Sequence, residues 1–216
     1  MTTRYIGRDN VRKRLEPGEG APGRTVYAGG AVRIEPAEGE LLVVRPSFGL
    51  AHTAEYDRVR AAPLLEEIAR DHVVAILLVR LGGYAVGVFE GERLVVSKVG
   101  SRFVKNRHKK GGSSANRFRR RREEQAADLV REAAEVAARV LEPQRNRAEF
   151  VALGGDRAAV DAVVAARADL AWLRERAIDR FLTVPEPRQR VLEALPYDLY
   201  AVEITVEDTS NGRVGA

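Results

Sequence analysis

Runs of apolar residues separated by glycine turns predict a β-sheet in the middle of the chain. Residues 73–80 form a nearly continuous apolar run, which is typical of a strand buried on both faces. Two further strands are expected at 84–90 and 93–99, because a glycine turn precedes each run. The pattern predicts a three-stranded meander whose third strand leads directly into a strongly basic segment.

A helical period of apolar residues follows this basic segment. Leu129, Ala133, Val136 and Val140 recur at steps of four, three and four, which places them on one face of a helix predicted over 117–141. Further elements are expected as a strand at 149–153, helices at 157–168 and 170–182, a short helix ending near 195, and a strand at 199–206. Strands that alternate with helices indicate an α/β fold with a mixed β-sheet flanked by helices.

The pattern divides the chain into four expected regions. Residues 1–24 are polar and rich in Pro and Gly, so we expect a flexible N-terminal segment there. Two short strands near 25–32 and 40–45 predict a small β-rich N-terminal appendage over 25–60. The α/β domain is expected over 61–206, beginning with a short amphipathic helix, and 207–216 are expected to form a disordered tail.

Composition excludes several classes of chemistry. The 216 residues are 45% hydrophobic, enough to bury a sizeable core, and contain no cysteine. Disulfides, Cys-ligated zinc, iron–sulfur clusters and thiol catalysis are therefore excluded. The N-terminus lacks the apolar segment of a signal peptide, and the longest apolar run, Val73–Val79, is too short to span a bilayer. We expect a cytoplasmic monomer that uses no cofactor and does not contact a membrane.

Positive charge is concentrated in residues 98–122, KVGSRFVKNRHKKGGSSANRFRRRR, which hold eleven Lys and Arg and no acidic residue. The rest of the chain carries 25 basic and 31 acidic residues, so the net charge of +5 comes from this one stretch. A basic segment around an uncharged glycine-containing insert suits a phosphate-rich partner such as RNA, because each neutralised phosphate releases counterions. The alternative is a solvated basic loop with no partner.

The residues around the glycines resemble the central domain of eukaryotic and archaeal translation termination factors, which carry Gly-Gly-Gln-Ser-Ala-x-Arg-Phe before a basic stretch and Arg-Glu-Glu. The matching positions here are Gly111, Gly112, Ser114, Ala115, Arg117, Phe118, Arg122, Glu123 and Glu124. The likeness covers roughly residues 65–206, including the strands before the loop. It implies an α/β domain that presents the loop 105–116 to the ribosome.

One departure from that motif matters, because Ser113 occupies the position of the family's catalytic Gln. By this pattern the chain is most similar to the Vms-type release-factor-like proteins of ribosome rescue, as a bacterial member. The resemblance implies a peptidyl-tRNA hydrolase that releases nascent chains from stalled complexes. Its implied partners are the large ribosomal subunit or the whole ribosome, peptidyl-tRNA and rRNA.

The chemistry of ester hydrolysis explains why small residues stand in this loop. A water must attack the carbonyl while a donor stabilises the developing oxyanion. Glycines permit close backbone approach, so the backbone N–H of Ser113 is a candidate donor. The catalytic candidates are Gly111, Gly112, Ser113, Ser114 and Asn116. The RNA-binding candidates are Lys105, Arg107, His108, Lys109, Lys110, Arg117, Arg119, Arg120, Arg121 and Arg122.

Two other functions stay open at this point. A nuclease acting at the tRNA acceptor end would cleave a phosphodiester instead of the ester. A non-enzymatic factor similar to the Pelota family, which shares a similar central domain but lacks the Gly-Gly-Gln loop, would bind the ribosome without hydrolysis. The length leaves no evident codon-reading domain, so stop-codon-dependent termination is not expected.

The remaining motifs favour structural roles. Gly154-Gly155-Asp156 lacks the spacing of a dinucleotide fingerprint, so we expect a strand-to-helix turn with Asp156 as the N-cap. His52, His72 and His108 show no spacing typical of metal ligands, and no metal site is expected. The lone Trp172 is expected in the core.

Overall fold

The computed structural model describes residues 2–80, 82–101 and 113–207, with the backbone alone described at 113–119 and 122. The chain forms two compact units, of which unit 1 combines residues 1–70 with 197–216 and unit 2 spans 71–196. Each unit has a hydrophobic core built only from its own residues. Unit 2 is therefore an insertion between two segments of unit 1.

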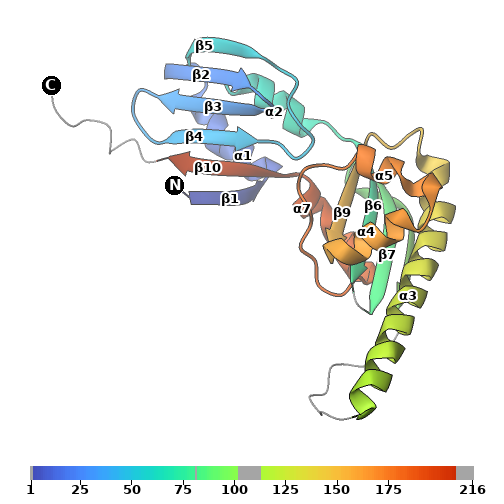
Figure 1. The fold of residues 1–216 in the computed structure, drawn as a ribbon. Helices are drawn as coiled ribbons and strands as arrows, with labels where there is room; N and C mark the ends of the chain where they lie inside the picture. The colour runs from blue at the N-terminus through green and yellow to red at the C-terminus, as the bar shows by residue number, and fades with distance from the viewer. Residues whose placement is uncertain (1, 81, 102–112, 208–216) are drawn as a thin grey trace. The chain divides into compact units, whose positions relative to one another are not determined.

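Unit 1 is built on a six-stranded antiparallel sheet. Its strands in spatial order are β1 (Thr2–Gly7), β10 (Ala201–Glu207), β4 (Leu41–Arg45), β3 (Ala31–Pro36), β2 (Pro22–Ala28) and β5 (Ala54–Arg58). The C-terminal strand β10 lies between β1 and β4, with Ile204 opposite both Arg4 and Val44. The two ends of the chain therefore meet in one sheet (Figure 1).

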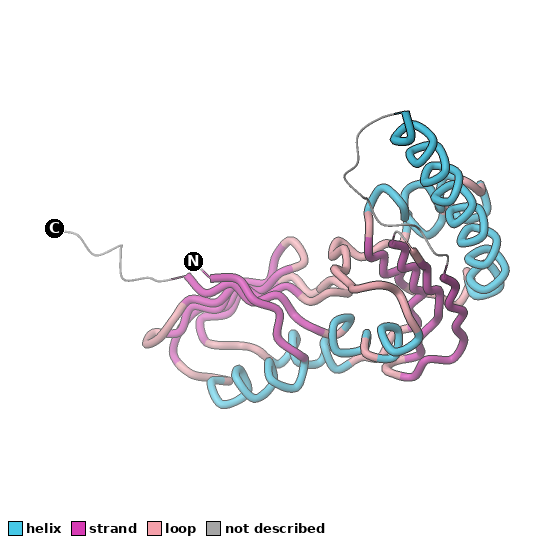
Figure 2. The backbone as a smooth tube through the Cα atoms, turned by 90° about the horizontal axis from the view of Figure 1, so that it is seen from below, coloured by secondary structure: helices cyan, strands magenta, loops and turns pink. Residues whose placement is uncertain are grey.

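Helices cover one face of this sheet, as seen in Figure 2. They are α1 (Arg8–Leu15), the 3-10 turn η1 (Glu16–Gly18) and α2 (Ala62–Ala69). Val11 of α1 and Leu64 of α2 are fully buried in the same cluster as Val32 and Ile34 of β3, whereas Arg33 between them is exposed. This alternation gives the sheet one apolar and one polar face.

The expected boundaries in unit 1 were wrong in three respects. The short helix expected to begin the α/β domain is α2, whose Leu64, Leu65 and Ile68 lie in the core of unit 1. Residues 2–24, predicted to be a flexible segment, contain β1, α1, η1 and the start of β2. The final strand, assigned by its pattern to the α/β domain, pairs with β1 and β4 of unit 1 instead. Local patterning shows that a strand is present but not which partner it chooses, and here the partner lies about 200 residues away. The predicted tail at 208–216 lies outside the described residues.

Unit 2 is built on a four-stranded mixed sheet in the order β8 (Arg93–Ser101), β7 (Gly83–Glu90), β6 (Val73–Arg80) and β9 (Phe150–Gly155). The first three strands form the predicted meander, with antiparallel pairing throughout. β9 adds in parallel on the far side of β6. β6 and β7 are buried along almost their whole length, as the continuous apolar run predicts.

The long helix α3 (Ser113–Leu141) and α4 (Arg157–Ala165) pack on one face of this sheet. Two 3-10 turns follow in unit 2, η2 (Glu142–Gln144) and η3 (Ala168–Leu170). The short helices are α5 (Trp172–Glu175), α6 (Gln189–Glu193) and α7 (Leu195–Leu199), and α7 leads into β10. Trp172 is buried as expected, and its Nε1 donates to Glu142 Oε2 at 3.0 Å. No helix within the described ranges is long and apolar enough to cross a membrane.

The mixed sheet flanked by helices is confirmed, and so is the turn at Gly154-Gly155-Asp156. Asp156 accepts a hydrogen bond from the Ala159 N–H at the start of α4. The predicted helix over 170–182 was wrong beyond Glu175, because the following residues lie along β9 with bridges at Ala177 and Leu182. Their backbone groups bond to the sheet edge, and this pairing overrides the local helical pattern.

Candidate functional site

The predicted loop connects the end of an edge strand to the start of the longest helix. The described chain stops at Ser101, the last residue of β8, and resumes at Ser113, the first residue of α3. The predicted site residues outside the described ranges are Lys105, Arg107, His108, Lys109, Lys110, Gly111 and Gly112. The backbone alone is described for Ser113, Ser114, Asn116, Arg117, Arg119 and Arg122. Of the predicted site, full side-chain placement is therefore available for Arg120 and Arg121.

The helix begins four residues earlier than its apolar period predicts. Ser113 to Asn116, expected in the loop, form the first turn of α3. Ser and Asn favour the ends of helices and Ala has a high helical propensity, so the helix can begin directly after the two glycines. The expected loop 105–116 is thus shorter at its C-terminal end.

Two halves of α3 have different surroundings. We call residues 113–128 the α3 arm and residues 129–141 the packed half. Leu129 is the first residue with a buried side chain described in the helix, and Ala133, Ala137 and Leu141 follow it into the core. Ser113 precedes Leu129 by sixteen residues, so the arm extends about 24 Å along the helix axis. The arm continues past the strands of unit 2 (Figure 1), which places Ser113 at its tip.

A tyrosine fixes the junction between the packed half and the strand that leads into the loop. Tyr84 of β7 pairs in register with Gly100 of β8, one residue before the strand ends. Its ring lies directly over Gly100, where an added Cβ would come within 2.3 Å of the ring. The Tyr84 hydroxyl, itself buried, donates to Glu132 Oε1 of α3 at 3.0 Å. The contact ties the end of β8 and the packed half of α3 to the same sheet.

This junction was not predicted from the sequence, although one signal was present. A glycine inside a strand indicates close approach by another group. Gly100 stands near the end of a strand rich in the β-branched residue Val. The pairing of that glycine with an aromatic residue sixteen positions earlier became visible only with the strand register.

The first turn of α3 offers hydrogen-bond donors at the tip of the arm. In an α-helix the N–H groups of the first residues have no carbonyl acceptor within the helix, which applies here to Ser113, Ser114 and Ala115. The helix dipole adds partial positive charge at the same end. The backbone at the predicted catalytic positions can therefore stabilise developing negative charge, whichever side chains stand there.

Positive charge on the arm is free to act on another molecule. Arg120 and Arg121 are exposed, and neither has a carboxylate or carbonyl partner among the described residues. Glu123 interacts with another group, and Glu124 is exposed on the helix surface. The arm thus combines unpaired guanidinium groups with backbone donors at its tip.

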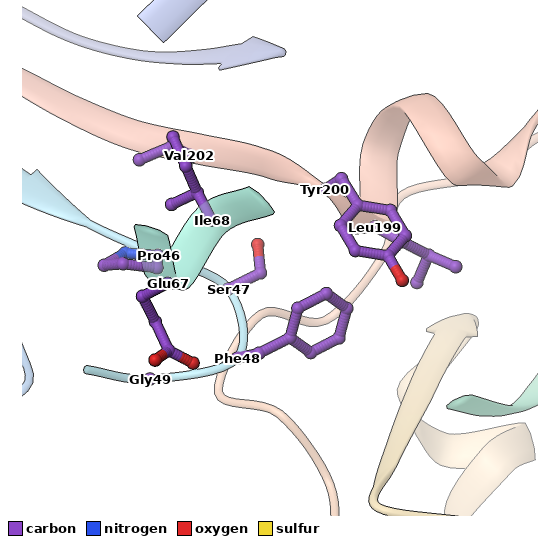
Figure 3. Close-up of a pocket in the computed structure, with 9 residues that line it drawn as sticks. All are labelled: Pro46, Ser47, Phe48, Gly49, Glu67, Ile68, Leu199, Tyr200 and Val202. Atoms are coloured by element: carbon purple, nitrogen blue, oxygen red, sulfur yellow. The ribbon is translucent and has the colours of Figure 1, made fainter. Parts of the chain in front are cut away.

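Elsewhere the structure offers little that competes with the arm as a site. A small pocket of unit 1, shown in Figure 3, is lined by Pro46, Ser47, Phe48, Gly49, Glu67, Ile68, Leu199, Tyr200 and Val202. Its lining is mostly apolar, and the edge-on rings of Phe48 and Tyr200 lie 5.2 Å apart. His52 bonds to Tyr56 and His72 to Glu149, both at 2.9 Å. Within the described part of the chain, no cluster of His, Asp or Glu could hold a metal ion.

Comparison with known proteins identifies one family and several distant folds. The family model described as Actinobacteria/chloroflexi VLRF1 release factor matches residues 72–205. No curated protein matches the chain. Among solved structures, an archaeal translation termination factor, aRF1, is 15% identical, with a TM-score of 0.43 over 90% of this chain and 73% of that chain. The Vms1 mitochondrial localization core is 13% identical, with a TM-score of 0.47 over 90% of this chain and 80% of that chain.

Proposed function

The chain belongs to the Actinobacteria/chloroflexi VLRF1 release factor family, and we propose that it is a peptidyl-tRNA hydrolase that releases nascent chains from stalled ribosomal complexes. The observation that carries this proposal is the α3 arm. A helix that extends about 24 Å beyond its own core ends in a turn of unpaired backbone donors, directly after two glycines. Such an arm is suited to deliver backbone into a narrow site walled by RNA.

The reaction is hydrolysis of the ester between the nascent chain and a ribose hydroxyl of tRNA. Water adds to the carbonyl carbon, the carbonyl oxygen becomes an oxyanion, and the C–O bond to the ribose then breaks. The nascent chain leaves with a free carboxyl group, and the tRNA regains its hydroxyl with a proton from the water. Donors aimed at the oxyanion lower this barrier, and the loss of one donor typically costs about 10²–10³ in rate.

We assign the donor role to the backbone at Ser113, with Ser114 and Asn116 as candidates to order the attacking water. Gly111 and Gly112 supply the small volume and the backbone freedom that close approach to the ester requires. Because positioning and electrostatic stabilisation supply most of the effect, no strong general base is needed at the position of the missing Gln.

The basic residues hold the arm against RNA in this proposal. Arg120 and Arg121 lie on successive positions of the helix and point to different sides, so one helix can contact phosphates on two walls. Phosphate contacts of this kind fix orientation without reading sequence. The remaining predicted cations, from Lys105 to Arg122, extend the same role toward the tip.

One experiment tests the proposal directly. Purified protein is incubated with stalled ribosome–nascent-chain complexes, and both the peptide and the tRNA 3′ end are analysed. We expect free peptide together with tRNA that keeps its complete CCA end. Peptide that still carries 3′-terminal nucleotides, together with tRNA shortened at its 3′ end, would assign the nuclease function instead. Binding without any release would assign the non-enzymatic one.

A further inference from the structure

Most cations of unit 2 whose side chains are described already have a partner within the unit. Carboxylates bind seven of its arginines: Arg93, Arg131, Arg145, Arg147, Arg167, Arg174 and Arg188. Backbone carbonyls bind Arg80 and Arg176, and Arg157 lies over the Phe181 ring. Within the described side chains of the unit, the cations without such a partner are Lys98, Arg120, Arg121, Arg139 and Arg190. These groups can bind another molecule without breaking an internal pair.

Lys98 lies on the strand that leads to the loop. It is exposed on β8, opposite Val86, and lies two residues before Gly100, with its Cβ on the same side of the sheet as α3. β8 is the outer strand of its sheet, where β7 is its single partner among the described strands. The ammonium group therefore stands at an open edge near the junction that Tyr84 forms.

Arg190 lies beside the same strand on the opposite face of the sheet. Its helix, α6, packs against β7 and β8, with Leu192 near the Gly87 backbone and Gln189 Oε1 3.4 Å from Ser97 Oγ. The segment before α6 passes the end of β8, because the Pro187 carbonyl lies 3.5 Å from a Cβ built on Gly83. Arg190 is exposed, and the nearby Glu193 accepts a hydrogen bond from Gln189. The second free cation thus lies close to the position of Lys98 along the edge.

We propose that Lys98 and Arg190 bind RNA phosphates and extend the RNA-binding surface from the α3 arm onto the body of unit 2. The two cations stand on either side of an open strand edge, and an RNA backbone that follows this edge toward the arm meets both. No described strand pairs with the outer edge of β8, and no residue of this strand carries a carboxylate. The identity of the RNA as ribosomal RNA or tRNA rests on the proposed function, whereas the phosphate contact does not.

The test compares the double variant Lys98→Gln/Arg190→Gln with Arg139→Gln. Arg139 is also exposed and unpaired, but it stands 26 residues beyond Ser113, about 39 Å from the tip of the arm. Both sets of changes lie on the surface, so melting temperatures should stay close to that of the wild type. Binding to purified large ribosomal subunits and to protein-free large-subunit rRNA is measured as a function of salt concentration.

We expect the slope of log affinity against log salt to fall by about 2 in the double variant and to remain unchanged in Arg139→Gln. The apparent KM for peptide release should rise while kcat stays constant, because these residues position the body rather than touch the ester. Equal slopes for the double variant and Arg139→Gln would overturn the proposal. A loss of slope on intact subunits but not on protein-free rRNA would overturn it as well and would assign an acidic protein surface as the partner.

The two proposals fail in different ways. If wild-type protein binds rRNA with the expected slope but releases no peptide, the hydrolase function fails and the phosphate surface stands. If wild-type protein releases peptide but the double variant binds with an unchanged slope, the phosphate surface fails and the hydrolase function stands.

Discussion

The packed half of α3 and the α3 arm belong to one continuous helix but have different surroundings. In the packed half, small and branched apolar side chains such as Ala133, Ala137 and Leu141 are held between the sheet and α4. In the arm, Arg120, Arg121 and Glu124 are exposed, and the described side chains include no buried one before Leu129. Burial stabilises one half, while the other depends on helical propensity and on extension from a helix already formed.

This difference separates stability from function within a single element. Substitutions in the packed half should act on folding, and substitutions in the arm should act on RNA binding or on release. Each variant below is therefore measured for both unfolding and activity, in order from the largest expected effect to the smallest.

The largest effect on stability is expected for Leu141→Ala in the packed half. Leu141 is fully buried, and removal of a buried leucine side chain typically costs about 2–5 kcal/mol of unfolding free energy. Denaturant unfolding of this variant and of Arg139→Gln, an exposed neighbour on the same helix, measures the contrast. If Leu141→Ala lost less unfolding free energy than Arg139→Gln, the packed half would not depend on burial for its stability.

The largest effect on activity is expected for Gly112→Ala, directly before the tip of the arm. A Cβ at this position restricts the backbone and the approach to the ester, so release should fall about 10²–10³-fold with unchanged stability. Ser113→Ala keeps its backbone N–H and should be mild, and Asn116→Ala should be intermediate if its amide orders water. Single-turnover release assays measure all three. A severe Ser113→Ala beside a mild Gly112→Ala would assign the chemistry to the hydroxyl instead.

An intermediate effect is expected for Arg120→Gln/Arg121→Gln in the arm. Each lost phosphate contact should lower the slope of log affinity against log salt by about 1 and weaken rRNA binding up to about tenfold at 0.1 M salt. Unfolding should stay within about 0.5 kcal/mol of the wild type, since both side chains are exposed. Arg139→Gln serves again as the control for loss of one exposed positive charge outside the arm. Equal salt slopes in the two variants would show that the arm does not contact RNA.

A smaller effect is expected at the junction between the packed half of α3 and the end of β8. Tyr84→Phe keeps the ring over Gly100 but removes the hydrogen bond to Glu132, which should cost about 0.5–1.5 kcal/mol. The release rate should fall less than in Gly112→Ala, because the arm keeps its donors and loses part of its anchoring. Hydrogen exchange of the β8 and α3 amides, compared with that of β9, locates the change. If the variant changed the exchange rates equally across unit 2, the hydrogen bond would not stabilise the junction specifically.

The smallest effect is expected for Glu90→Gln, at the end of β7. Hydrogen bonding from Arg147, together with the Arg93 charge, lowers the pKa of Glu90. A carboxyl group whose pKa is lower in the folded protein stabilises it above its ordinary pKa, and this contribution is lost as the pH falls through the folded value. The variant should melt slightly below the wild type at neutral pH, and the difference should vanish at pH values well below about 4.3. A constant difference at all pH values would contradict the ion pair.

The sequence by itself determined the elements whose signals are local. The apolar runs predicted the meander of β6, β7 and β8, and the period of Leu129, Ala133 and Val136 predicted the packed half of α3. Asp156 marked a helix start because its side chain caps a backbone N–H three residues away. The Gly-Gly-Ser-Ser segment and its basic flanks identified the candidate site, whose residues remain predictions.

The tertiary structure alone decided the pairings between distant segments. β10 has the same alternating pattern whether it completes unit 1 or unit 2, and only its hydrogen bonds to β1 and β4 place it in unit 1. Residues 176–182 have a helical pattern, but bonds to the edge of β9 keep them extended. The Tyr84–Glu132 contact joins side chains 48 positions apart. A local pattern fixes which face of an element is apolar, whereas long-range hydrogen bonds and packing decide which partner covers it.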